Sequence, residues 1–78
     1  MRVVLEIARD DSHLSLRREA DFRIVPRVGE WVELADGWAS ELVKSVTWAH
    51  DGEEVTIALH GKLNEEDVVK LLREGWRP

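Results

Sequence analysis

Two Asp-Gly pairs, Asp36-Gly37 and Asp51-Gly52, constrain the fold of this chain more than any other feature. Glycine adopts positive φ without strain and aspartate favours turns, so an Asp-Gly pair between alternating apolar residues is a strong hairpin signal. Apolar residues alternate with polar ones before the first pair, between the pairs and after the second. The spacing therefore predicts a three-stranded antiparallel meander over residues 30–60.

The middle strand of this meander has a less regular pattern. Leu42, Val46 and Trp48 have the same parity, and only Lys44 interrupts them. Successive side chains of a strand point to opposite faces of the sheet, so residues of one parity share a face. We therefore expect Leu42, Val46 and Trp48 to face the core, with Trp48 packed inside it.

The N-terminal residues predict a hairpin over residues 2–17. Apolar residues alternate with polar or small ones on both sides of a polar turn at residues 10–13. Alternation of this kind is typical of strands with one buried face. The alternating residues are Val3, Leu5, Ile7, Leu14 and Leu16.

The next segment leads from the hairpin to the meander. Residues 18–21 are mostly polar and are expected to leave the strand. Phe22 and Ile24 resume the alternation as far as Pro26, which suits a strand end better than a central position because it has no N–H. We expect a bend over residues 25–30, so that the strands of this part of the chain span residues 22–60.

Residues 64–74 predict a helix. Asn64 is a favoured N-cap, and the three acidic residues after it suit the positive end of the helix dipole. Gly75 is expected to end the helix, and Trp76 to pack back against its last turn. A helix of about ten residues is marginal on its own, so it must dock on the sheet. Its apolar stripe is Val68, Val69, Leu71 and Leu72.

Together these segments predict a single domain over residues 1–78. The predicted class is mainly β (α+β), with a small antiparallel sheet or partly closed barrel of about five strands and one C-terminal helix. A chain of 78 residues holds one small core. Chains of this size often gain stability from a disulfide, a metal or an oligomer contact, and the absence of cysteine excludes the first.

One stretch of the sequence resembles a known group of proteins. Residues 25–34, the pattern Val43, Val46 and Trp48, and the alternating segment 51–59 resemble small SH3-like β-barrels of bacteria and phages. The resemblance covers residues 22–60. It implies an SH3-like, partly closed barrel but no agreed activity, and it carries no functional residue with it. A phage or mobile-element accessory protein is one form that the interaction module predicted below can take.

Charge is distributed unevenly along a chain whose formal net charge is −5. Residues 1–29 hold six arginines against five acidic residues, whereas residues 30–78 hold five basic against eleven acidic residues. An acidic chain disfavours nucleic acid as a partner, because Lys and Arg contacts with phosphates supply most of the non-specific affinity.

Two functions other than protein binding stay open as alternatives. The first is a nucleic-acid-binding small barrel that uses an arginine stripe formed by Arg17, Arg18, Arg23 and Arg27. The second is an acidic mimic of a polyanion that occupies a basic groove on another protein. Its surface is formed by Glu30, Glu33, Glu53 and Glu54.

The sequence predicts no enzyme, cofactor or metal site, and no small-molecule substrate is evident. The absence of cysteine removes thiolate ligands and thiol nucleophiles. His13, His50 and His60 lack the spacing of a ligand set, and neighbours such as Ser12 and His13 rarely point at one another as a nucleophile and its base must. No segment has the length and hydropathy of a membrane span, so no membrane partner and a cytoplasmic location are expected.

The tryptophans and arginines predict a binding surface. Trp31 has the opposite parity to Val32 and Leu34, so it belongs to the face away from the core, and Trp38 follows a turn and is expected to be partly exposed. Large aromatics and Arg dominate binding hot spots. We therefore predict a non-enzymatic protein-interaction module, or a homo-oligomer subunit, although Trp31 covering the second face of the sheet is the structural alternative. The predicted binding residues are Trp31, Trp38, Arg23 and Arg27.

Overall fold

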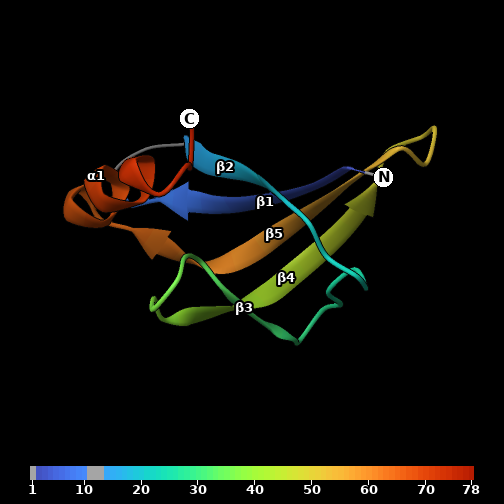
Figure 1. The fold of residues 1–78 in the computed structure, drawn as a ribbon, viewed down its shortest axis with the longest axis horizontal. Helices are drawn as coiled ribbons and strands as arrows, with labels where there is room; N and C mark the ends of the chain where they lie inside the picture. The colour runs from blue at the N-terminus through green and yellow to red at the C-terminus, as the bar shows by residue number, and fades with distance from the viewer. Residues whose placement is uncertain (1, 11–13) are drawn as a thin grey trace.

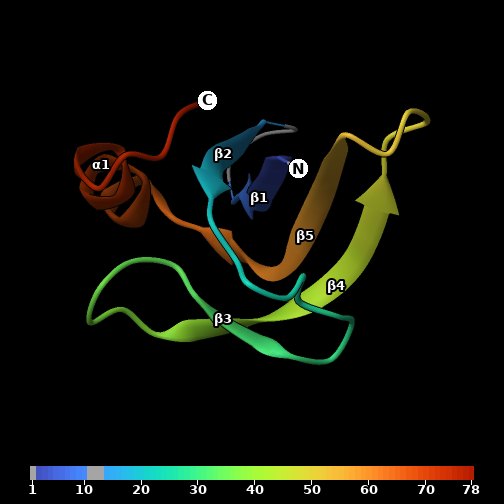
Figure 2. The same ribbon diagram turned by 45° about the vertical axis from the view of Figure 1, so that its right-hand side comes forward.

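Five strands form one sheet in the computed structural model, which describes residues 2–10 and 14–78. The sheet curls into a half-barrel with α1 at one end (Figures 1 and 2). Its strand order is β2-β1-β5-β4-β3. This confirms the predicted mainly β class with about five strands and one C-terminal helix. The elements are β1 (Arg2–Arg9), β2 (Ser15–Ala20), β3 (Trp31–Glu33), β4 (Ser40–Trp48), β5 (Glu54–Leu63) and α1 (Glu65–Arg73).

The sheet is mixed. One of the two predicted forms, a purely antiparallel sheet, is therefore not observed. β1 pairs antiparallel with β2, and β3, β4 and β5 form the predicted antiparallel meander. The two parts join because β1 pairs parallel with β5, with Val3 opposite Val55 and Leu5 opposite Ile57. The sequence contains no turn signal for this pair, because two parallel strands cannot be connected by a tight turn and are joined by a long stretch of chain.

The segment between β2 and β3 differs from its prediction. β2 continues to Ala20 because Arg18 and Ala20 pair with Leu5 and Val3 of β1, so residues 18–20 do not leave the strand. Residues 21–30 form no strand, and the alternation of Phe22 and Ile24 does not mark one. This segment instead connects the two outermost strands of the half-barrel (Figure 2).

A β-bulge changes the face of the first residues of β4. Val43 lies opposite Leu59 and Ser45 opposite its neighbour Ala58, so Lys44 is an extra residue. Because of this extra residue, residues before Lys44 face the opposite side of the sheet from residues of the same parity after it. Val43 is therefore buried, and Leu42 lies on the outer face, so the prediction that Leu42 faces the core is wrong.

Trp48 does not pack in the core, contrary to its prediction. It lies opposite Val55 and shares a face with Val46, as its parity indicates. However, it is the last residue of β4, at the end of the sheet, and its side chain is 53% exposed. Parity placed Trp48 on the correct face but could not show that the core ends before it.

The core fills the inner face of the half-barrel and extends to the helix. Val55 and Ile57 of the central strand β5 are fully buried. Leu71 of α1 and Trp76 are also fully buried, so the helix end closes the core. The other buried members include Val3, Leu5, Ile7, Leu16, Val32, Leu34, Val43, Leu59, Leu63 and Val68.

The turns and the helix follow their predictions. Gly37 and Gly52 have φ of +80° and +75° in the turns after β3 and β4. The Asn64 side chain caps α1 by accepting a hydrogen bond of 2.8 Å from the Asp67 N–H. Trp76 is fully buried, and its backbone N–H donates to the Leu71 carbonyl at 3.1 Å. The predicted turn at residues 10–13, with Ser12 and His13, lies largely outside the described residues.

The two outermost strands differ in what lies beside them. Arg17 of β2 and Arg77 exchange two backbone hydrogen bonds of 2.6 and 2.8 Å, so the chain after the helix covers part of the β2 edge. Within residues 2–10 and 14–78, no strand pairs with the outer edge of β3. β3 is therefore the open side of the half-barrel.

Candidate binding site at the free edge of β3

The backbone of β3 presents hydrogen-bonding groups away from the sheet. The Val43 N–H donates to the Glu30 carbonyl at 2.8 Å, so that carbonyl points toward β4. The C=O and N–H of a trans peptide point in opposite directions, so the Trp31 N–H points away from β4. These directions alternate along the strand. The backbone N–H and C=O of Val32 therefore point toward β4, and those of Trp31 and Glu33 point away from it. The edge offers two donors and two acceptors.

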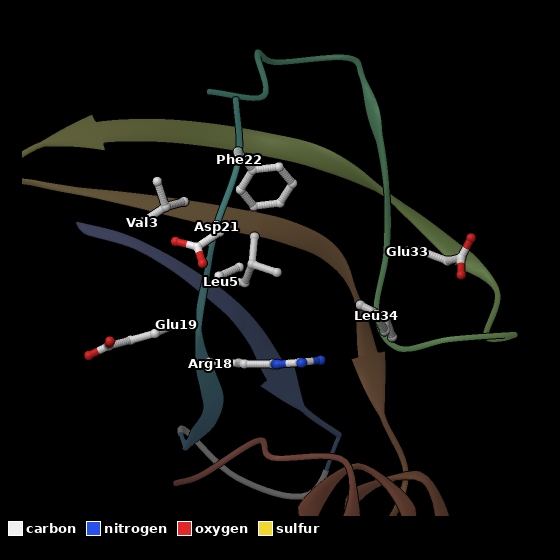
Figure 3. A pocket seen from close by; sticks show the side chains of 9 residues that line it. Val3, Leu5, Arg18, Glu19, Asp21, Phe22, Glu33 and Leu34 are labelled. Carbon is white, nitrogen blue, oxygen red and sulfur yellow. The ribbon is translucent and has the colours of Figure 1, made fainter. Parts of the chain in front are cut away.

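Two neighbouring cavities lie along this edge. The first, of about 440 Å³, lies between residues 18–22 and residues 33–34 (Figure 3). The second, of about 490 Å³, lies between residues 22–27 and residues 30–33. Phe22 and Glu33 line both cavities. We call the combined cavity the seam, with residues 18–27 as one wall and residues 30–34 as the other.

Apolar side chains cover much of the seam. Val3, Leu5, Phe22 and Leu34 lie around the first cavity, and the Arg18 side chain extends from β2 across it toward Leu34 (Figure 3). Ile24, Val25 and Pro26 line the second cavity beside Trp31. Ile24 is 82% exposed and Trp31 is 65% exposed. Large apolar side chains gathered this openly are typical of interaction surfaces.

Acidic groups outnumber arginines along the seam. The lining contains Arg18 and Arg27 against Glu19, Asp21, Glu30 and Glu33. Arg27 is already engaged, because its Nε lies 3.8 Å from Glu30 Oε1 and its N–H donates to the same oxygen at 2.6 Å. Glu33 points away from the first cavity, toward the outer face (Figure 3). Glu19 is likewise paired, with Arg2 at 2.7 Å. Since Glu30 is paired with Arg27, the seam keeps a small acidic excess, Asp21 and Glu33 against Arg18.

The four predicted binding residues lie in different environments. Trp31 and Arg27 line the same part of the seam. Arg23 is exposed on the connecting segment between β2 and β3. Trp38 is half-buried and packs against the core after the turn at residues 35–38. In this turn the backbone N–H of Trp38 donates to the Ala35 carbonyl. The structure therefore brings together Trp31 and Arg27, and it turns Trp38 toward the core.

Sequence reasoning missed the second wall of the seam. Phe22 and Ile24 alternate as the residues of a strand do and predicted one, whereas Val25 and Pro26 were predicted to lie in a bend. Their proximity to Trp31 depends on the connection crossing from one edge of the half-barrel to the other. Pro26 was the available signal, because it argues against a central strand at this position.

The alternative arginine stripe is divided in the structure. Arg17 and Arg18 are consecutive residues of β2, so their side chains point to opposite faces. Arg17 pairs with Glu6 at 3.2 Å on the outer face, whereas Arg27 pairs with Glu30 at the seam. Arg17 and Arg18 nevertheless line one cavity, together with Arg2 and Arg77. Arg27 lies apart at the seam, so the predicted stripe is not continuous.

Neither metal-ligating nor membrane-spanning features mark the described part of the chain. No group of three or more His, Asp or Glu side chains is gathered within residues 2–10 and 14–78, and His13 lies outside them. The one helix described, α1, is too short and too polar to cross a membrane.

Comparisons with protein-family models, curated proteins and solved structures give no match, so they assign the chain to no family.

Proposed function

We propose that this protein is a non-enzymatic protein-interaction module that binds a partner polypeptide at the seam. One observation carries the proposal: Trp31 is largely exposed on a strand whose outer edge is open, next to an apolar groove. Aromatic anchors in such grooves supply much of the binding energy of protein interfaces. Arg27 and Arg23 belong to the rim of the proposed surface.

The proposal is tested with a matched pair of tryptophan variants. Trp48 is the control, because it is also about half exposed but lies far from the seam. Trp31 lies opposite Leu42, and Trp48 is six residues further along β4, which places it about 20 Å from Leu42. Peptides selected from a displayed random library on the wild-type protein serve as the probe. We expect Trp31→Ala to weaken their binding by about tenfold or more and Trp48→Ala to leave it unchanged.

The stability of both variants provides the necessary check. About a third of Trp31 and about half of Trp48 is buried, so we expect both variants to stay folded and each to lose about 1–2 kcal/mol of stability. Selected peptides that bind Trp31→Ala as tightly as the wild type would show that the surface lies elsewhere. A library that yields no binder at all would equally count against the proposal.

A further inference from the structure

We infer that the partner segment at the seam is an extended strand with basic residues on one face and apolar residues on the other, which pairs with β3 as a sixth strand. This inference rests on the proposed function, because it concerns the same site. It identifies the kind of partner and the way in which it binds.

The backbone of β3 favours an added strand over side-chain docking alone. The N–H and C=O groups of Trp31 and Glu33 point away from β4, and no strand of the described residues covers them. An extended peptide at a sheet edge satisfies such groups with its own main chain. Trp31 and Glu33 are two residues apart, which is also the spacing at which an extended peptide presents its backbone groups to one side.

The walls of the seam favour an isolated strand as the partner over the β3 edge of a second copy of this chain. If another copy offered its own β3, its β4 would lie on the far side of that strand. Residues 18–27 already stand there as the second wall of the seam. A strand without a neighbour, such as a terminus or an extended loop of another protein, has no such conflict.

The side chains of β3 define the two faces of the added strand. On the outer face it would lie next to Trp31 and Glu33, where a basic side chain gains attraction from the carboxylate and from the indole ring. On the inner face it would lie next to Val32, which is buried, with Phe22 and Leu34 near by. The complementary sequence alternates basic and apolar residues.

Synthetic peptides of defined sequence test this inference. The probe is the peptide Arg-Val-Lys-Val-Arg-Val-Lys with a fluorescent label, titrated with the full chain at low salt. We expect saturable binding that falls by about tenfold or more when Glu replaces each basic residue, because the seam has an acidic excess. We expect a similar loss with the Trp31→Ala variant and none with Trp48→Ala.

Backbone methylation separates strand addition from side-chain docking. One derivative carries N-methyl groups on all valines and the other on all basic residues. In a paired strand alternate N–H groups point toward the neighbour, so methylation of one set should abolish binding and methylation of the other should leave it within about threefold. Loss with the methylated basic residues indicates antiparallel pairing with β3, and loss with the methylated valines indicates parallel pairing.

The outcomes that overturn the inference differ from those that overturn the proposed function. If both methylated peptides bind as well as the parent, or if the acidic peptide binds equally well, the strand-addition inference is wrong. Library peptides that still need Trp31 would then leave the proposed function standing. Binding that ignores Trp31 in both experiments overturns both. A dimer in sedimentation that the parent peptide does not dissociate favours a second copy and also overturns the inference.

Discussion

Trp76 connects three parts of the molecule at a single residue. Its backbone N–H donates to the Leu71 carbonyl at 3.1 Å, which closes the end of α1. Its indole Nε1 donates to the Leu34 carbonyl at 2.9 Å, next to the seam, and its side chain is fully buried. The helix, the chain after β3 and the core therefore meet at one side chain.

Replacement of Trp76 tests this role. The variant Trp76→Phe removes the indole N–H, leaves the buried Leu34 carbonyl without that donor and reduces the packed volume. We expect it to lower the free energy of unfolding by about 2–4 kcal/mol in urea denaturation followed by circular dichroism. Trp48→Phe is the control and should stay within about 0.5 kcal/mol of the wild type. An equal and small effect of both changes would contradict the central position of Trp76.

Sequence reasoning succeeded for residues whose position depends on local structure. The place of Trp76 follows from a helix stop, and the exposure of Trp31 follows from its parity next to Val32. The prediction failed for Trp48, which occupies the end of a strand, because the extent of the core depends on the lengths of the neighbouring strands. Parity alone carries no information on those lengths.

At the scale of elements, two bulges shape the half-barrel. In β4, Lys44 is the extra residue. In β5, the partners of Glu6 and Ala8 are Ala58 and Lys62, so β5 contains two residues more than β1 over this stretch. β5 bends at its lower end in Figure 2, and bulges are the usual way in which a strand bends. The bend brings the end of β5 toward α1.

Gly61 provides the element-scale prediction. Its φ is +97°, and a Cβ there would lie 2.8 Å from Glu41 Oε2. We expect Gly61→Ala to destabilise the protein by about 1–2 kcal/mol from backbone strain, because the Glu41 carboxylate ends a flexible side chain and can move aside at little cost. Adding Glu41→Ala should therefore recover little of the loss in thermal or urea unfolding. Wild-type stability of Gly61→Ala would show that this bend does not need glycine.

Element prediction from the sequence was accurate where a turn or cap residue marks a boundary. Both Asp-Gly turns and the Asn64 cap lie where their residue types indicate. The bulge at Lys44 has no comparable signal, since an exposed lysine fits any strand, whereas Gly61 is a signal for the irregularity in β5 that the sequence analysis did not use. The wrong face for Leu42 follows directly from the unrecognised bulge.

At the scale of the whole molecule, the open side of the sheet depends on strand order. The meander and the hairpin join through the parallel pair of β1 and β5, which leaves β2 and β3 as the two edges. Arg77 covers part of one edge, and the other remains open beside the seam. The residues of the candidate site were partly predictable, but the edge was not, because it arises from pairing between distant segments.

The most direct test of an open edge that accepts a strand is amide hydrogen exchange read residue by residue. In the free protein at low concentration, we expect slow exchange at Val32, which bonds to β4, and fast exchange at Trp31 and Glu33. Saturation with the basic–apolar peptide should then slow exchange at Trp31, Glu33 or both. Slow exchange at Trp31 and Glu33 in the free protein, or no change on saturation, would show that β3 has no open edge that accepts a strand.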